Sequence, residues 1–382
     1  MKKILLMAVS AALLAAGCQK TEIQNEVRTP IGFNTQMGKL TKAGPDAENS
    51  GLYDNLVAQG FRVWGYFATQ GDINYAYHEY YFDEIIEVTG TSEPVTGEDG
   101  TETTSYNWST GDKTYYWPGK EKELDIYAIS SWKDNYDLTA EGNVTITHAT
   151  DETPAKVEIK DFVVTPDADN DLMVAALIRQ DQDDDKFIRP HFEHALTKVV
   201  LNFQSYGGSE VYVISATTSE INSKATLSVT NTEPAETDGN STKKSVATFS
   251  WGEQSEAQSY NAQCKVTSET VSDVIKEDGT TGSYEAVKLN TEEFITFGSW
   301  LLLPQEKDEK ITDPLENHYL DVKFIVDKMY VEQRFMLKVD NKVTEWKRNQ
   351  LTTYNVTISP DYIQFDPDVK EWADTIEDVF EN

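Results

Sequence analysis

The sequence predicts an all-β protein built of two antiparallel β-sandwiches. Many short segments alternate apolar and polar residues with a period of two, and turn residues separate them. Apolar stripes at the helical spacing i, i+3, i+4 and i+7 are scarce, so no helix longer than one or two turns is expected. The chain has 382 residues, which exceeds the length at which one hydrophobic core stops growing and favours two domains.

The composition indicates a folded protein with a strongly acidic surface. The formal net charge is −32, while 39% of the residues are apolar and 11% are aromatic. Enough apolar material is present to form real cores, so the acidic residues predict a solvated surface rather than disorder. Nucleic acid and anionic membrane surfaces are both polyanions that this charge would repel, and the sequence therefore predicts neither as a partner.

The first eighteen residues predict export as a lipoprotein. Lys2 and Lys3 give a positive start, residues 4–16 are apolar apart from one serine, and small residues directly precede Cys18. This apolar run is too short for a transmembrane helix, which needs about twenty residues. It resembles a bacterial lipobox, in which Cys18 is lipidated and becomes the first residue of the mature chain. The usual large aliphatic residue stands one position early, at Leu14, and the alternative is a soluble secreted protein cleaved near residue 17.

The remaining cysteine carries little information about function. Cys264 is the only cysteine besides Cys18, so no disulfide framework and no cysteine-based metal site can form. A buried, inert thiol is the expectation.

The N-terminal half begins with a short candidate strand. Ile31, Phe33 and Met37 alternate with polar residues and glycine until residues 39–45 break the pattern. Residues 61–67 are apolar on both parities, which is typical of a strand covered on both faces. Further strands are expected within residues 75–88, 106–118, 124–129, 144–146, 157–164 and 172–178, and residues 90–105 read as a surface loop.

The C-terminal half begins after an acidic run at residues 180–185, which we interpret as a linker. The predicted division is therefore a signal segment at residues 1–18, a first domain at 19–186 and a second at 187–382. The clearest hairpin places residues 320–326 against 331–339 around Asp327 and Lys328. Other strands are expected at residues 199–203, 211–214, 294–303, 354–358 and 363–369, and loops at 231–245 and 267–282.

Motifs for catalysis or metal binding are not found. Residues 167–171 and 181–185 have the alternating acidic residues of a calcium loop, but lack its glycine at position six and its glutamate at position twelve, so solvated loops are favoured. His191 and His194 would point to opposite faces of an extended segment. The chain also lacks the nucleophile, phosphate-loop and zinc-protease motifs. We predict a protein that is not an enzyme and binds no cofactor or metal.

The first half of the chain is rich in aromatic residues, and this enrichment can be interpreted in two ways. They could form a platform for stacking on sugars, which would favour a surface-exposed glycan-binding lipoprotein as the alternative function. Aromatic strands of this density are more often core, and we favour that interpretation. The residues concerned are Trp64, Tyr66, Trp108, Tyr115, Tyr116 and Trp117.

The order of several motifs resembles the fimbrillin family of Bacteroidales lipoproteins. After the lipobox, the resemblance rests on residues 31–33, 41–43, 108–118, 124–128, 171–175, 192–199, 346–354 and 363–372, and so covers nearly the whole chain. It implies two tandem transthyretin-like β-sandwich domains. It also implies a subunit of a type V pilus, located at the outer membrane and in the fimbrium, whose partners are copies of itself and other fimbrial subunits.

The resemblance further implies proteolytic processing followed by donor-strand exchange. A trypsin-like protease would cut after Lys39 or Lys42, where the family usually has arginine, with Arg28 as a fallback. The displaced strand, about residues 30–38, would carry Ile31, Phe33 and Met37, whose burial at about 1.5 to 3 kcal/mol each is worth roughly 4 to 9 kcal/mol. The donor strand would carry Ile363, Phe365 and Val369, with residues 354–358 as the alternative donor.

Overall fold

The structure is a computed structural model of the chain. It describes residues 29–33, 60–69, 79–91, 95–96, 102–103, 106–118, 122–130, 137, 140–148, 153–164, 171–180, 187–188, 190, 192–232, 246–262, 264–360 and 363–371. All regular elements within these ranges are β-strands, which confirms the predicted all-β class. Among the same residues no helix is long and apolar enough to span a bilayer.

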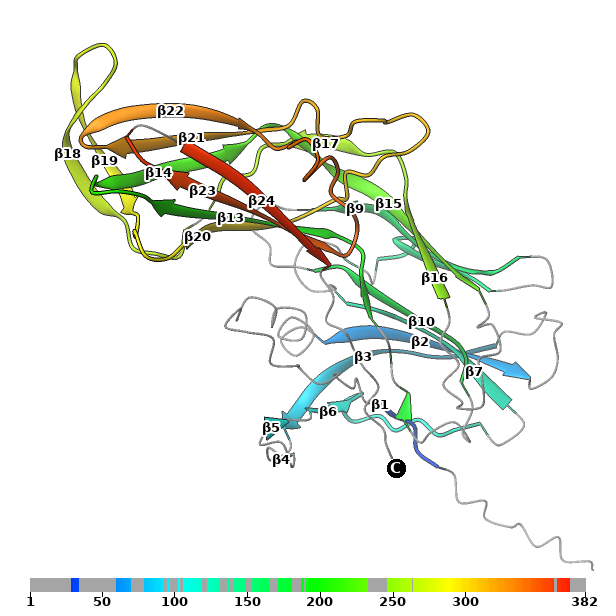
Figure 1. The fold of residues 1–382 in the computed structure, drawn as a ribbon. Coiled ribbons are helices and arrows are strands. Elements are labelled where there is room, and N and C mark those ends of the chain that lie inside the picture. Colours follow the sequence, from blue (N-terminus) through cyan, green and yellow to red (C-terminus); the bar gives the residue numbers. More distant parts are fainter. Residues whose placement is uncertain are drawn as a thin grey trace, which may run out of the picture.

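The N-terminal half is organised by one curled sheet, in the lower part of Figure 1. Its strands follow the spatial order β11-β1-β6-β3-β2-β7-β10-β12. Their bounds are β1 (Gly32–Phe33), β2 (Phe61–Thr69), β3 (Glu79–Thr91), β6 (Tyr106–Ser109), β7 (Lys122–Ile129), β10 (Met173–Gln180), β11 (Phe187–Ile188) and β12 (Glu193–His194). The short β4 (Val95–Thr96) and β5 (Glu102–Thr103) pair with each other inside the segment that we expected to be a loop.

Strand β2 is covered on both faces, as its sequence predicts. Phe61 and Val63 are fully buried in an aromatic-rich core shared by both ends of the sheet. Trp64, which points to the opposite face, belongs to a second and larger core. Since β1, β3 and β6 contribute to the same aromatic core as β2, β7 and β10, the sheet must curl around it.

A second sheet joins strands from both sides of residue 186. Its order is β16-β15-β9-β8, and β17 pairs with β15. The bounds are β8 (Val144–Thr147), β9 (Ala155–Val163), β15 (Ile221–Thr232), β16 (Val246–Trp251) and β17 (Ser255–Gln258). Strands β11 and β12 likewise follow residue 186 but pair with β1 and β10. The chain therefore exchanges strands across the expected boundary, and the division into domains at residue 186 stays a prediction.

The C-terminal half packs a sheet of order β20-β13-β23-β24 against strands that close in the order β14-β19-β18-β22-β21, in the upper part of Figure 1. The first sheet consists of β13 (Thr197–Ser205), β20 (Ile295–Leu302), β23 (Gln350–Ile358) and β24 (Ile363–Glu371). The second group consists of β14 (Val211–Thr218), β18 (Glu269–Ile275), β19 (Thr281–Lys288), β21 (Tyr319–Val326) and β22 (Met329–Met336). Phe203, Phe324 and Tyr354 are buried between them in the larger core.

The predicted hairpin is confirmed, and a second predicted loop, besides residues 90–105, contains a strand. Strands β21 and β22 pair in register around Asp327 and Lys328, whose positive φ angles of 45° and 69° suit a tight hairpin turn. Residues 267–282, expected to be a loop, instead contain β18, which forms a hairpin with β19. The loop prediction failed because β18 is mostly exposed and buries Val274 alone, so its apolar alternation is weak.

Candidate assembly strands

Strand β1 is held by few backbone contacts. The Ile31 N–H donates to the Tyr115 carbonyl oxygen at 2.8 Å, and the Trp117 N–H donates to the Thr29 carbonyl oxygen at 2.9 Å. Phe33 pairs with Trp108 of β6 on one side, while β1 runs parallel to β11 on the other. Within the described residues 29–33, which include β1, these are the backbone contacts to neighbouring strands, and the side chains add the buried contacts.

The Phe33 side chain is the main apolar anchor of β1. It is 5% exposed and contacts Phe61 and Phe82 edge-on, with ring centroids 6.4 and 6.2 Å away. Ile31 is half-buried against the same aromatic core. Both residues thus pack into one apolar core, and their role as a displaced strand stays a prediction. Met37, the third predicted member of this strand, lies outside the described residues.

Phe33 packs against Phe82, and the position of the Phe82 ring depends on a glycine, Gly65 of β2, that pairs with Phe82. A Cβ atom added at Gly65 would lie 2.5 Å from the Phe82 ring, closer than real side-chain contacts allow. The missing side chain leaves room for the tip of the Phe82 ring over Gly65, and the same ring contacts Phe33. The small residue at this position therefore shapes the cavity that β1 fills.

The segment formed by residues 113–117 borders β1 on the side away from β11, and we call it the slot wall. Lys113 Nζ and Tyr115 Oη both donate hydrogen bonds to Glu84 Oε1 of β3. Burial alone would raise the pKa of Glu84, but these two donors outweigh it and lower the pKa. Burial and the neighbouring Glu84 carboxylate raise the pKa of Tyr115, so its hydroxyl stays a donor. Sequence reasoning placed these aromatic residues in a strand and missed the contacts, because Glu84 is distant in sequence.

Strand β24 is an edge strand with a complete ladder. All nine of its residues pair antiparallel with β23, from Ile363 opposite Ile358 to Glu371 opposite Gln350. The Phe365 ring stacks on Phe335 and on Tyr354, with centroids 5.1 Å away in both cases. Ile363 and Phe365 are half-buried. Val369 is 36% exposed, so β24 is paired along its length but only partly covered.

The alternative donor segment lies in a different environment. Strand β23 is central, between β13 and β24, and its Tyr354, Val356 and Ile358 side chains are fully buried. The Tyr354 hydroxyl donates to the Leu337 carbonyl oxygen at 2.7 Å and accepts from Trp346 Nε1 at 3.0 Å. Removing β23 would open the core of its own half, whereas removing β24 would expose one edge.

The remaining sequence candidates are structural or undescribed. Trp64, Trp108 and Trp117 are 7%, 8% and 4% exposed, so these three are core residues. Of the other aromatic residues considered for a sugar platform, Tyr66 and Tyr115 are half-buried and Tyr116 is 40% exposed. Asp171 and His194 form a buried pair, with 2.5 Å between Oδ2 and Nδ1. The pair connects β12 to the residues that directly precede β10. Cys18, Lys39, Lys42 and His191 lie outside the described residues, as do most residues of both acidic runs.

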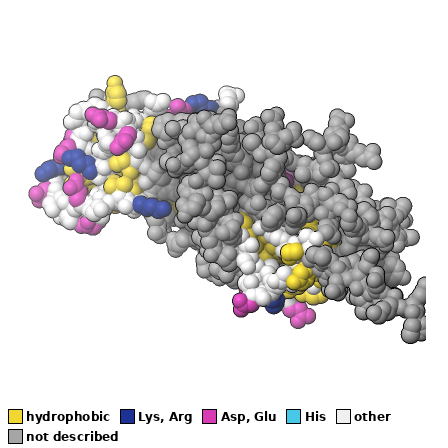
Figure 2. Space-filling view, turned by 90° about the horizontal axis from the view of Figure 1, so that it is seen from below, with side chains coloured by type: hydrophobic (Ala, Val, Ile, Leu, Met, Phe, Trp, Pro, Cys, Tyr) yellow, Lys and Arg dark blue, Asp and Glu magenta, His cyan; other side chains and the backbone are white. Residues whose placement is uncertain are grey.

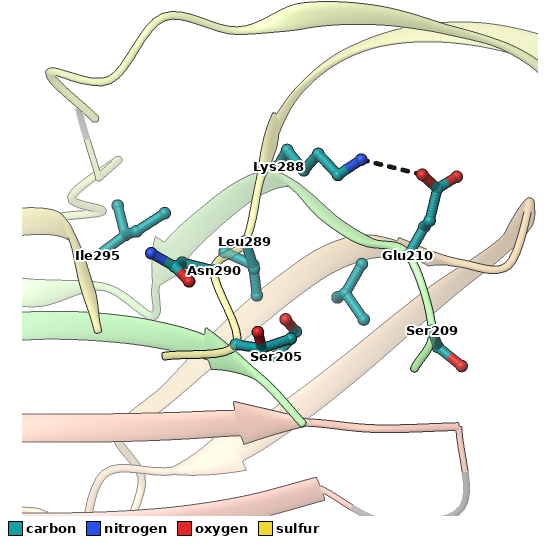
Figure 3. A pocket seen from close by; sticks show the side chains of 9 residues that line it. Ser205, Ser209, Glu210, Lys288, Leu289, Asn290 and Ile295 are labelled. Atoms are coloured by element: carbon teal, nitrogen blue, oxygen red, sulfur yellow. Dashed lines mark hydrogen bonds and ion pairs between the residues drawn. The ribbon is translucent and has the colours of Figure 1, made fainter. Parts of the chain in front are cut away.

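A hollow of about 500 Å³ lies at the far end of the C-terminal half, where β13 and β19 end and β14 and β20 begin (Figure 3). Its charged residues neutralise each other, because Lys288 Nζ lies 2.9 Å from Glu210 Oε1. The same end of the molecule carries interspersed acidic and basic side chains at the left of Figure 2. The hollow contains no predicted site residue and is open to solvent.

A family model and one solved structure agree with this architecture. A family model described as Fimbrillin-like matches residues 83–372. A fimbrial protein from Bacteroides vulgatus is 12% identical, with a TM-score of 0.53, and the match covers 90% of this chain and 99% of that one. A candidate cell adhesion protein from Bacteroides uniformis is 15% identical, with a TM-score of 0.47 and coverage of 91% and 99%. No curated protein sequence matches significantly. At such low identity, the first structure supports the fold alone.

Proposed function

Because the chain belongs to the fimbrillin-like family, we propose that it is a structural subunit of a type V fimbria that supports adhesion at the cell surface. In this proposal the chain is exported as a lipoprotein and anchored in the outer membrane through Cys18. A trypsin-like protease then cleaves after Lys39 or Lys42, and the subunit polymerises with copies of itself and other fimbrial subunits by donor-strand exchange. The chain acts by assembly and performs no catalysis.

The main observation behind the proposal is how β1 is held in the sheet. Phe33 fills an aromatic cavity, while the described part of the strand, Gly32–Phe33, pairs with β6 and β11 through these two residues. Loss of such a strand leaves an apolar slot bordered by unpaired backbone groups, which is the surface that a strand from another chain can complete. Cleavage after Lys39 or Lys42 would free β1 from the rest of the subunit.

The position of β24 supports it as the donor over β23. Removal of the edge strand β24 breaks its pairing with one neighbour. Removal of the central strand β23 would break its pairing with two neighbours and expose the core. Ile363, Phe365 and Val369 share one parity, and they would replace Ile31, Phe33 and Met37 of the neighbouring subunit.

The processing step is tested by replacing Lys39 and Lys42 together with Gln. The expected result is a chain that folds, keeps its N-terminal segment and forms no ladder of oligomers on gels after treatment with a trypsin-like protease. The mass of the mature N-terminus, from cells and from shed fibres, identifies the cut. Ladders whose subunits begin at Thr29 would move the cut to Arg28; because β1 would then stay attached to the subunit, they would contradict β1 as the displaced strand. Ladders formed by uncleaved subunits would overturn the proposal.

A further inference from the structure

The slot wall must keep its shape if a second strand is to bind where β1 was. Residues 113–117 follow β6 but form no continuous strand of their own. Their backbone supplies the Tyr115 carbonyl oxygen and the Trp117 N–H that bond β1. A segment held only by those bonds would lose its position when β1 leaves.

The first independent contact of the slot wall is with Glu84. Its carboxylate, on β3, accepts hydrogen bonds from the side chains of both Lys113 and Tyr115. The Tyr115 ring also packs on Phe82 and Tyr81, with centroids 5.0 and 5.8 Å away. The Tyr115 backbone thus bonds β1 while its side chain is fixed to β3.

The second independent contact is with Tyr81. Its hydroxyl donates to the Tyr116 carbonyl oxygen at 2.5 Å and accepts from the Tyr116 N–H at 3.2 Å. The Tyr81 ring is stacked on Phe67 of β2, with centroids 4.3 Å away. A single hydroxyl therefore fixes both polar groups of the Tyr116 backbone, and no atom of residues 29–33 takes part.

We propose that Tyr81 and Glu84 are positioning residues that hold the slot wall in its strand-accepting conformation after β1 has left. The inference rests on the proposed function, because it concerns the slot that a donor strand would enter. A wall that is already ordered spares the incoming strand the entropy cost of ordering it, which speeds and strengthens binding.

The test uses residue-resolved hydrogen exchange on the full chain carrying Phe33→Ala, which makes β1 detach more often; Ile31→Ala is the milder version. The Trp117 amide, which bonds Thr29, is expected to exchange faster than in the unaltered chain. The Tyr116 amide, which bonds Tyr81, is expected to keep its protection. Equal loss of protection at Tyr116 and Trp117 would overturn the proposal.

Three hydroxyl deletions sharpen the test. Adding Tyr81→Phe or Tyr115→Phe to the Phe33→Ala chain should speed exchange of the Tyr116 amide at least about tenfold. Adding Tyr80→Phe should not, because Tyr80 is on the same strand but 59% exposed. Amides of the β21–β22 hairpin report general stability, and faster exchange there by the same factor would show a merely structural role.

A second measurement separates this inference from the proposed function. A labelled peptide of residues 360–382 is added to the Phe33→Ala chain, and its association rate is expected to fall at least about tenfold with Tyr81→Phe but not with Tyr80→Phe. Equal rates for these two variants would overturn the positioning role. If the peptide does not bind but the Tyr116 amide stays protected, strand exchange at this slot would be rejected, while the inference that the slot wall stays ordered would be retained.

Discussion

Strands β1 and β24 are held in opposite ways. In the described residues, β1 pairs over Gly32–Phe33 and its Phe33 side chain is 5% exposed, whereas β24 pairs over all nine residues and its Val369 side chain is 36% exposed. A buried side chain requires a cavity of matching shape, while a backbone ladder forms with almost any strand of suitable parity. Under the proposed function, β1 would therefore mark a selective slot and β24 a strand that can change partners.

Among the changes that test this comparison, deletion of every residue after Ser359 is expected to have the largest effect on stability and assembly. Without β24, β23 becomes an edge strand and the stacked faces of Tyr354 and Phe335 lose Phe365. The free energy of unfolding should fall by several kcal/mol. After protease treatment the shortened subunit should accept a strand but donate none.

The length of the oligomers formed after protease treatment, seen as a ladder of bands on gels, checks the effect of this deletion. Small amounts of the shortened subunit, mixed with the full chain, should shorten the ladders by terminating growth. Circular dichroism of the shortened chain is the control for folding. Ladders of normal length from a folded, shortened subunit would mean that β24 is not the donor.

A smaller effect is expected from Phe33→Ala. The substitution empties the cavity beside Phe61 and Phe82, and cavities of this kind cost about 3 to 5 kcal/mol. Ile31→Ala should cost less, because Ile31 is half-buried. Urea unfolding of the uncleaved chain gives both values, and equal costs would contradict the view that Phe33 is the main anchor of β1.

A still smaller effect is expected from Gly65→Ala, which keeps β1 intact but displaces the Phe82 ring. Because the new Cβ would lie 2.5 Å from that ring, the free energy of unfolding should fall by about 1 to 3 kcal/mol. Gly208→Ala is the matched control, since a Cβ there meets no atom within 4 Å. A thermal-unfolding midpoint for Gly65→Ala as high as that of the control would show that Phe82 moves freely and does not shape the slot.

The elements that the sequence predicted well have strong local signals. Residues 61–67 are apolar on both parities and form the doubly covered β2, and Asp327 with Lys328 marks the turn of the β21–β22 hairpin. Strand β18 was missed because it faces solvent. The pairing of β15 with β9 was missed because an acidic run near residue 186 carries no information on which strands pair across it.

The candidate site was predictable only in part. Alternation identified Ile31 and Phe33 as separable apolar residues, and it gave the parity of Ile363 and Phe365. The contacts that hold the slot wall were not predictable, because they join Tyr81 and Glu84 to residues about thirty positions later through the hydroxyl groups of Tyr81 and Tyr115 and the ammonium group of Lys113. Such contacts depend on how β3 and the wall fold together, and no periodicity in the sequence reports them.

The central claim is that β24 enters the slot of a neighbouring subunit with Phe365 facing inward, and paired charge substitutions test it most directly. Phe365→Asp and Gln364→Asp place the same charge on adjacent residues of opposite parity, one half-buried and one exposed. The stability of each uncleaved variant is measured first, because Phe365 also packs within its own subunit.

Both variants are then treated with protease and their ladders compared. An unpartnered carboxylate in an apolar slot costs several kcal/mol at each junction, so Phe365→Asp should give ladders reduced to a few subunits, while Gln364→Asp should give ladders of normal length. Equal ladders from the two folded variants would contradict the account.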